Sequence, residues 1–168
     1  VLFRSRDDLN HWLRPHGLFF APETSTANRA MIGGMIGNNS CGSNSIRYKS
    51  TREHLLEVTA LLSDGSEVVF GNLTTDQFHA KCELPGREGE IYRHIRQMLS
   101  SPAARQEIED GFPHPDIERR NTGYALDQLM TTDPFVAGGP VFNFCKLLAG
   151  SEGTLAFITS AKLSLEPL

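Results

Sequence analysis

The chain has 168 residues, of which 39% are hydrophobic and 21% charged, and its formal net charge is -4. These values are typical of one globular domain, or part of one, and exclude a disordered chain. No apolar run approaches the roughly 20 residues of a spanning helix, and no basic stripe suits a nucleic-acid backbone, so neither a membrane span nor a nucleic-acid partner is predicted.

Three cysteines, Cys41, Cys82 and Cys145, are far apart and form no C-x-x-C pair. Their spacing argues against a disulfide framework and a local metal site, and it favours a reducing cytoplasm. We expect Cys82 in a loop and Cys145 in the core. Cys41 lies in a glycine-rich run, where it is either a small packed residue or a redox thiol without a resolving cysteine nearby.

The two ends of the chain predict a partial domain. Residues 1–5, "VLFRS", show no helix or strand pattern and resemble a translated sequencing adapter, so the fold prediction leaves them out. The alternation in "GTLAFITSAKLSLEPL" stops at Leu168 without a closing turn. We therefore expect residues 6–168 to belong to a domain truncated at both ends.

Helical spacing occurs in three places. In "DDLNHWL" an Asp cap at Asp7 precedes apolar residues at helical spacing, and Pro15 follows the end. Residues 88–100 place apolar side chains on one helix face, and Pro102 begins another helix. We treat these helices as scaffold.

Strand patterns occur in two places. Residues 55–71, "LLEVTALLSDGSEVVFG", alternate around an Asp64-Gly65 turn and predict a hairpin. The segment "FNFCKLLAGSEGTLAFITSAKLSL" predicts a helix ending near Gly150, a glycine turn and a β-branched strand.

A polar, glycine-rich run, "MIGGMIGNNSCGSNSIRYKS", covers residues 31–50 and contains no carboxylate. Glycine lets main-chain N–H groups approach a ligand, so such a run suits a phosphate. If "RAMIGGMIG" begins a helix, the partial positive charge of its N-terminus adds to these amides. Its spacing matches neither the P-loop nor the Rossmann fingerprint. A flexible surface loop is the alternative interpretation of this run taken by itself.

Four motifs in order change that balance: "PETSTANRAMIGGMIGNNSCGSNSIRY", "LLSDGSEV", "NTGYALDQL" and "LLAGSEGTLAFIT". Together they resemble the FAD-linked oxidase family, whose PCMH-type FAD-binding domain is shared with vanillyl-alcohol oxidase. The resemblance covers roughly residues 7–168. Within that family the chain is most similar to the D-2-hydroxyacid dehydrogenases acting on D-lactate or D-2-hydroxyglutarate, of the large type with iron–sulfur clusters.

The resemblance implies an α+β fold, mainly the larger second lobe of the domain, with an antiparallel sheet flanked by helices. The family's first phosphate loop, of the R-G-G-G-T-S type, is not in this sequence. We therefore expect the N-terminal lobe and the downstream substrate and iron–sulfur domains to lie outside the chain. The implied cofactor is non-covalent FAD, with 4Fe-4S clusters only in that other part. A cytoplasmic location is expected, with peripheral attachment to the inner membrane face as the alternative.

The resemblance also implies a set of cofactor-binding residues, matched one by one to the family's motifs. They are Pro22, Glu23, Ile32, Gly33, Gly34, Gly37, Asn38, Asn39, Cys41, Gly42, Ser45, Glu152, Gly153 and Ile158. In the family the last three contact the adenosine end through backbone groups, and we expect Glu152 to order its turn. Lys49 stands where many relatives have glycine, and a positive φ there would disfavour lysine.

No catalytic residue and no metal ligand is predicted. Arg52, Glu53 and His54 follow a Ser-Thr cap signal and are interpreted as a solvated helical turn. The other histidines carry no further signal. Arg119 and Arg120 have two interpretations, a bidentate clamp for a carboxylate substrate or a solvated basic pair before a turn.

The resemblance implies oxidation of a D-2-hydroxyacid of the lactate, glycolate or 2-hydroxyglutarate class to the 2-oxoacid, with hydride transfer to FAD. We expect the chain to be inactive alone, and its electron acceptor is left open. One alternative is a non-catalytic nucleotide-binding or structural module on the same scaffold. Another is an enzyme of the same fold that acts on a nucleotide-sugar or an aromatic alcohol.

Overall fold

The computed structural model describes residues 5–114, 116–117, 120–121 and 123–168. The helices are α1 (Arg6–Leu13), the 3-10 helix η1 (Arg14–His16), α2 (Ile32–Asn38), α3 (Ser45–Tyr48), α4 (Thr51–His54), α5 (Thr75–Cys82), α6 (Gly86–Ser100), α7 (Pro102–Gly111), α8 (Leu126–Leu129) and α9 (Cys145–Leu148). The strands are β1 (Leu18–Phe19), β2 (Leu55–Leu61), β3 (Glu67–Phe70), β4 (Asn72–Leu73), β5 (Phe142–Asn143), β6 (Phe157–Leu163) and β7 (Glu166–Pro167).

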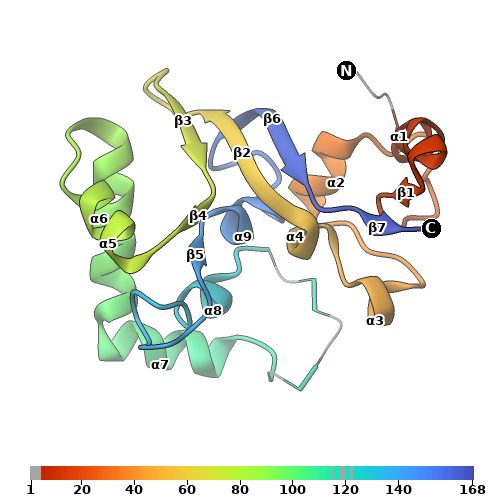
Figure 1. The fold of residues 1–168 in the computed structure, drawn as a ribbon. Coiled ribbons are helices and arrows are strands. Elements are labelled where there is room, and N and C mark those ends of the chain that lie inside the picture. The colour runs from red at the N-terminus through yellow and green to blue at the C-terminus, as the bar shows by residue number, and fades with distance from the viewer. Residues whose placement is uncertain (1–4, 115, 118–119, 122) are drawn as a thin grey trace.

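An antiparallel sheet in the order β3-β2-β6 occupies the middle of the molecule (Figure 1). Because side chains alternate along a strand, Val58, Ala60, Val68 and Phe70 are buried on one face. The β2–β3 turn has Gly65 at φ 83°, and the Ser66 N–H donates to the Asp64 side chain at 3.0 Å. The predicted hairpin and the α+β fold class are confirmed.

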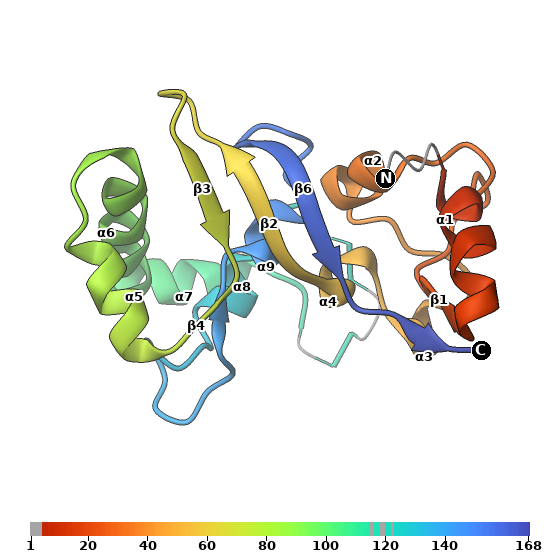
Figure 2. The ribbon, with the colours of Figure 1, turned by 45° about the horizontal axis from the view of Figure 1, so that its top comes forward.

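The main core lies between the sheet and the helices α5, α6 and α9. Figures 1 and 2 show α5 and α6 on one side of the sheet and α1 with β7 on the other. Six rings form what we call the aromatic cluster: Phe70, Phe78, Tyr92, Phe135, Phe142 and Phe144. The Phe78 and Phe142 centroids lie 4.7 Å apart in an edge-to-face arrangement, a geometry that aromatic rings prefer.

The helix predictions hold with one change. α6 and α7 match their predicted positions, and Pro102 is in the first turn of α7. The first helix, however, is not capped by Asp7. Its cap is Ser5, whose Oγ accepts from the Asp8 N–H at 3.2 Å while the Asp8 carboxylate accepts from the Ser5 N–H at 3.1 Å. Ser5 thus belongs to the fold, although the sequence pattern left it out.

The structure confirms the predicted position of one cysteine and contradicts that of another. Cys82 ends α5 and is buried in the core, so its placement in a loop was wrong; the helical segment from Thr75 carried too few apolar residues to be recognised. Cys145 is a core residue as predicted, and burial raises the pKa of its thiol to about 12. Within the described residues, no helix has the length and apolar character that crossing a membrane requires.

Candidate cofactor-binding site

Helix α2 presents an open backbone surface. Gly33 and Gly34 are exposed, have no positive φ, and would have no atom within 4 Å of an added Cβ. The N-cap residue Met31 supplies no side-chain cap. Alanine would therefore fit at both positions, and it would favour the helix by about 1 kcal/mol relative to glycine. The fold itself does not require these two glycines. They leave main-chain atoms bare toward solvent.

The residue that caps the C-terminal end of α2 is buried and polar. Asn39 is 0% exposed in the left-handed region at φ 53°, and its Oδ1 accepts from the Arg52 N–H at 2.8 Å. Ser50 Oγ lies 2.8 Å from this Oδ1 and 2.6 Å from the Glu53 carboxylate, and its single proton can be donated to only one of them at a time. Asn39 Nδ2 has no acceptor among the described residues. A buried donor left unpaired is costly, so it suits a site where a ligand supplies the acceptor.

The second glycine segment packs against the last turn of α2. The Glu152 N–H donates to the Gly37 carbonyl at 2.9 Å, and the Glu152 carboxylate accepts from Asn38 Nδ2 at 3.0 Å across 114 residues of chain. Glu152 and Gly153 both have positive φ, at 51° and 75°. The structure thus brings together Gly37, Asn38, Glu152 and Gly153, and Glu152 orders the turn as its prediction stated.

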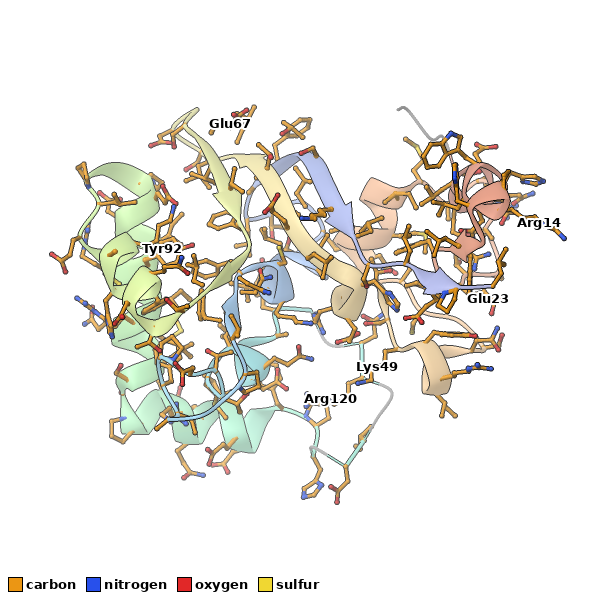
Figure 3. The ribbon with its side chains drawn as sticks, in the orientation of Figure 1. Arg14, Glu23, Lys49, Glu67, Tyr92 and Arg120 are labelled. Carbon is orange, nitrogen blue, oxygen red and sulfur yellow. The ribbon has the colours of Figure 1, made fainter. Side chains whose placement is uncertain are left out.

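A third group of predicted residues is explained by packing. An added Cβ on Gly42 would lie 2.7 Å from the Glu23 carbonyl oxygen, so glycine is required for this close approach. The Glu23 carboxylate accepts from Ser43 Oγ at 3.0 Å and Asn44 Nδ2 at 2.8 Å. Figure 3 shows Glu23 at the β7 end of the molecule and Tyr92 at the opposite, helical end. Gly42 and Glu23 therefore shape the loop that follows α2.

The remaining predicted residues lie mostly in protein surroundings. Pro22 and Ser45 are buried, and Ser45 Oγ has no partner in the described part of the chain. Cys41 is half-buried in the loop. Ile32 and Ile158 pack against the core. Ile158, on β6, pairs with Ala60 on β2. Both isoleucines are only half-buried.

The prediction of a solvated turn at 52–54 is wrong. Arg52 is 2% exposed, and His54 is buried with Nε2 2.8 Å from the Tyr48 carbonyl oxygen. Because a carbonyl only accepts, Nε2 donates this bond, and Nδ1 lies 3.0 Å from Ser164 Oγ and 3.4 Å from the Ser164 carbonyl oxygen. His54 is thus a structural residue. One of its partners, Ser164, follows β6 and lies 110 residues along the chain, which local spacing does not reveal.

Arg120 is neither a free carboxylate clamp nor a solvated residue. It forms an ion pair with Asp127 and donates to the Pro113 carbonyl at 3.0 Å, and its side chain is only 18% exposed. Asp127 comes from α8, whose position the sequence did not predict. Arg119, the other half of the predicted pair, lies outside the described residues.

Lys49 adopts a backbone conformation that is unfavourable for lysine. Its φ of 58° and ψ of -150° lie in a region occupied almost only by glycine. The residue is exposed between α3 and α4. The positive φ considered at this position is therefore present, and Lys49 is strained.

Tyr124 is a candidate that sequence reasoning did not single out. Its hydroxyl is 2.6 Å from Thr154 Oγ1, which in turn donates to the Ser151 carbonyl at 2.6 Å. The ring remains 44% exposed. Tyr124 therefore holds the 150–154 turn through Thr154. Its position in the motif "NTGYALDQL" was the sequence feature that could have identified it.

Other possible sites are less informative. No group of three His, Cys, Asp or Glu side chains among the described residues is placed to hold a metal ion. An apolar cavity of about 510 Å³ lies between the hairpin turn, α6 and α9, lined among others by Leu62, Phe70, Ile91 and Leu147. None of the predicted cofactor residues lines it.

Comparison with known proteins finds a family model and several enzymes similar to this chain. Residues 5–71 match the family model described as FAD binding domain. The D-2-hydroxyglutarate dehydrogenases of Pseudomonas putida and Escherichia coli K12 are 39% and 37% identical over 163 residues, or 97% of this chain. The mitochondrial D-lactate dehydrogenase [cytochrome] 1 of Saccharomyces cerevisiae is 39% identical over 62 residues, 37% of this chain and 10% of its own length. The chain spans only 15% of the two D-2-hydroxyglutarate dehydrogenases.

Proposed function

We propose that this chain, which belongs to the FAD-linked oxidase family, is part of the FAD-binding domain of an enzyme that oxidises a D-2-hydroxyacid to the 2-oxoacid. The match to the family model ends at residue 71, and we propose that the domain continues through residue 168. The residues proposed to hold FAD are those of α2 and its C-terminal end, together with the 150–153 turn.

The observation that carries this proposal is the pair of helix glycines, Gly33 and Gly34. Both have room for a Cβ and neither has a positive φ, so the folded chain gains nothing from them. Close approach of a ligand to the backbone accounts for both.

FAD, when bound, supplies the hydride acceptor. The residues of this chain bind and orient it. Asn38 and Glu152 join the two glycine segments through a hydrogen bond of 3.0 Å, so residues of both segments would hold the same cofactor. No described residue is assigned as the acid or base of the reaction.

The substrate class rests on the matched relatives. Those that match along 97% of the chain are D-2-hydroxyglutarate dehydrogenases, and shorter matches are D-lactate dehydrogenases. Both names share a D-2-hydroxyacid, and the size of its side chain is open between the lactate, glycolate and 2-hydroxyglutarate classes. We also propose a cytoplasmic location, and iron–sulfur clusters outside the residues of this chain.

Alanine at the two helix glycines tests the cofactor site. Gly33→Ala and Gly34→Ala should each stabilise the flavin-free protein by up to about 1 kcal/mol, because alanine favours the helix. Each should also weaken FAD binding at least about tenfold, measured by quenching of flavin fluorescence in the longest polypeptide that contains this chain.

Gly111→Ala is the matched control. Gly111 is also an exposed helix glycine with room for a Cβ, but it ends α7. It should change stability without changing FAD affinity. If Gly33→Ala and Gly34→Ala bind FAD as tightly as the control does, α2 does not hold the cofactor.

Substrate turnover is tested with the same complete polypeptide. Anaerobic addition of D-2-hydroxyglutarate, D-lactate or glycolate should bleach the flavin absorption, and the L-enantiomers of the chiral acids should not. A polypeptide that binds flavin but is reduced by none of these acids would contradict the proposed activity. A colourless polypeptide would favour the non-catalytic module instead.

A further inference from the structure

Arg52 is a buried cation at the meeting point of four segments. Its Nε donates to the Lys146 carbonyl at 2.9 Å, and its Nη2 donates to the Gly123 carbonyl at 2.8 Å and the Ala149 carbonyl at 2.7 Å. Its main-chain N–H donates to Asn39 Oδ1 at 2.8 Å. We call these five residues the Arg52 junction. It connects α4, the end of α2, the end of α9 and the loop at Gly123.

Two of the connected segments are the proposed cofactor segments. Ala149 directly precedes Gly150, whose N–H donates to the Ile36 carbonyl in α2 at 3.0 Å. An added Cβ on Gly150 would lie 2.8 Å from the Gly123 carbonyl oxygen and 2.9 Å from Arg52 Nη2, and Gly150 has φ 96°. The backbone therefore packs directly against the guanidinium at the start of the 150–153 turn.

The charge of Arg52 is costly at this place. Burial lowers the pKa of Arg52, and the Glu53 and Asp127 carboxylates act in the opposite direction. A guanidinium satisfies several carbonyls at fixed directions, which an ammonium or an apolar side chain does not. The benefit of the residue is thus geometric, because it sets how the connected backbones lie relative to one another.

Two other arginines also donate hydrogen bonds to main-chain carbonyls. Arg93 donates to the Cys82 and Leu84 carbonyls at 2.7 and 2.9 Å, and Arg105 donates to the Leu99 and Met130 carbonyls at 3.2 and 3.0 Å. Neither contacts α2 or the 150–153 turn through these bonds. They are matched controls for the loss of an arginine that binds main-chain carbonyls.

We propose that Arg52 is a positioning residue for FAD, which holds α2 and the 150–153 turn at the spacing needed for both to contact one cofactor. This inference rests on the proposed function, because it concerns the same cofactor. Arg52 itself does not touch the cofactor in this account. It acts through Asn39 on one side and Ala149 on the other.

The test compares Arg52→Lys with Arg105→Lys in the longest polypeptide that contains this chain. Arg52→Lys should raise the Kd for FAD about tenfold, or about 1.4 kcal/mol, and should change the visible circular dichroism of the bound flavin. In the flavin-free protein, hydrogen exchange at the Gly150 and Glu152 amides should accelerate. Arg105→Lys should leave the Kd within about twofold and these amides unchanged.

A second variant guards against a general loss of folding. Gly150→Ala disturbs the same junction from the turn, and it should also weaken FAD binding and speed exchange at the Glu152 amide. If Arg52→Lys does not fold, an unchanged FAD affinity in Gly150→Ala overturns the proposal. If Arg52→Lys folds and matches Arg105→Lys in affinity and exchange, the proposal is likewise wrong.

The two proposals fail in different ways. A wild-type polypeptide that does not bind FAD contradicts the proposed function. Exchange in the flavin-free protein still shows whether Arg52 couples α2 to the turn, and equal exchange in both lysine variants would contradict the coupling. A wild type that binds FAD, with an Arg52→Lys variant that binds it equally well, contradicts only the role of Arg52.

Discussion

The aromatic cluster and the Arg52 junction both connect segments that are distant in sequence, but by opposite physical means. The aromatic cluster buries six rings, whose attraction depends little on direction and mainly on the area removed from water. The Arg52 junction uses short hydrogen bonds to carbonyls 71 to 97 residues away, which depend strongly on direction. The aromatic cluster thus contributes mainly buried apolar area, whereas the Arg52 junction fixes how distant backbone segments are oriented.

The largest effect should come from the aromatic cluster. Phe142→Ala removes a fully buried ring 4.7 Å from Phe78 and 4.9 Å from Phe144 by centroid distance. It should lower the free energy of unfolding by about 3–5 kcal/mol in a denaturant titration, through lost burial and a cavity. FAD affinity of the folded fraction should stay the same. A loss below about 1 kcal/mol would show that the aromatic cluster contributes no more to stability than a surface site does.

A smaller loss is expected at Asn39 in the Arg52 junction. Asn39→Ala should cost about 2 kcal/mol, because the buried Arg52 N–H loses its acceptor and alanine at φ 53° is strained. Asn39→Gly removes the same side chain without that strain and should recover about 1 kcal/mol of the loss. Equal unfolding free energies for the two variants would show that the left-handed backbone contributes nothing.

A gain is expected at Lys49, next to the junction. Lys49→Gly should raise the free energy of unfolding by about 1 kcal/mol, since strain of this kind costs about 1–3 kcal/mol and the added chain entropy of glycine offsets part of it. Lys49→Ala removes the charge but keeps the strain and should give no gain. A gain in the alanine variant would instead point to the lysine side chain as the source.

The smallest effect concerns pH. Burial acts to raise the pKa of Glu53, but hydrogen bonds from Ser50 and the charges of Lys146 and Arg52 outweigh it and lower that pKa overall. Glu53 therefore stabilises the fold above the unfolded value of roughly 4.3, and this contribution is lost as the pH falls through the lower folded pKa.

Glu53→Gln tests this sign. Its Tm deficit relative to the wild type should be present at pH 7 and should shrink below about pH 4. Glu67→Gln, at an exposed carboxylate on β3 (Figure 3), is the control and should track the wild type. A deficit that persists unchanged at low pH would show that the charge of Glu53 does not matter.

Prediction from the sequence succeeded where a local pattern carries the information. The hairpin at 55–71 and helices α6 and α7 follow from alternation, helical spacing and proline positions. It failed at Arg52, His54 and Arg120, which were interpreted as solvated or as substrate contacts. Arg52 and His54 bond to Ala149 and Ser164, about a hundred residues along the chain, which no local window contains. Arg120 pairs with Asp127 only seven residues away, and its ion pair depends on the fold of the intervening loop and α8, which the sequence pattern did not predict.

Among the candidate site residues, the sequence by itself determined which segments lack side chains, and thus where a backbone can lie open to a dinucleotide. The roles of individual glycines came only from the tertiary structure. Gly33 and Gly34 are free of neighbours, whereas Gly42 and Gly150 are required by backbones 2.7 and 2.8 Å from an added Cβ. All glycines are identical in the sequence. Only the neighbouring residues in the folded chain show whether the space beside a glycine is filled by the protein or is open to a ligand.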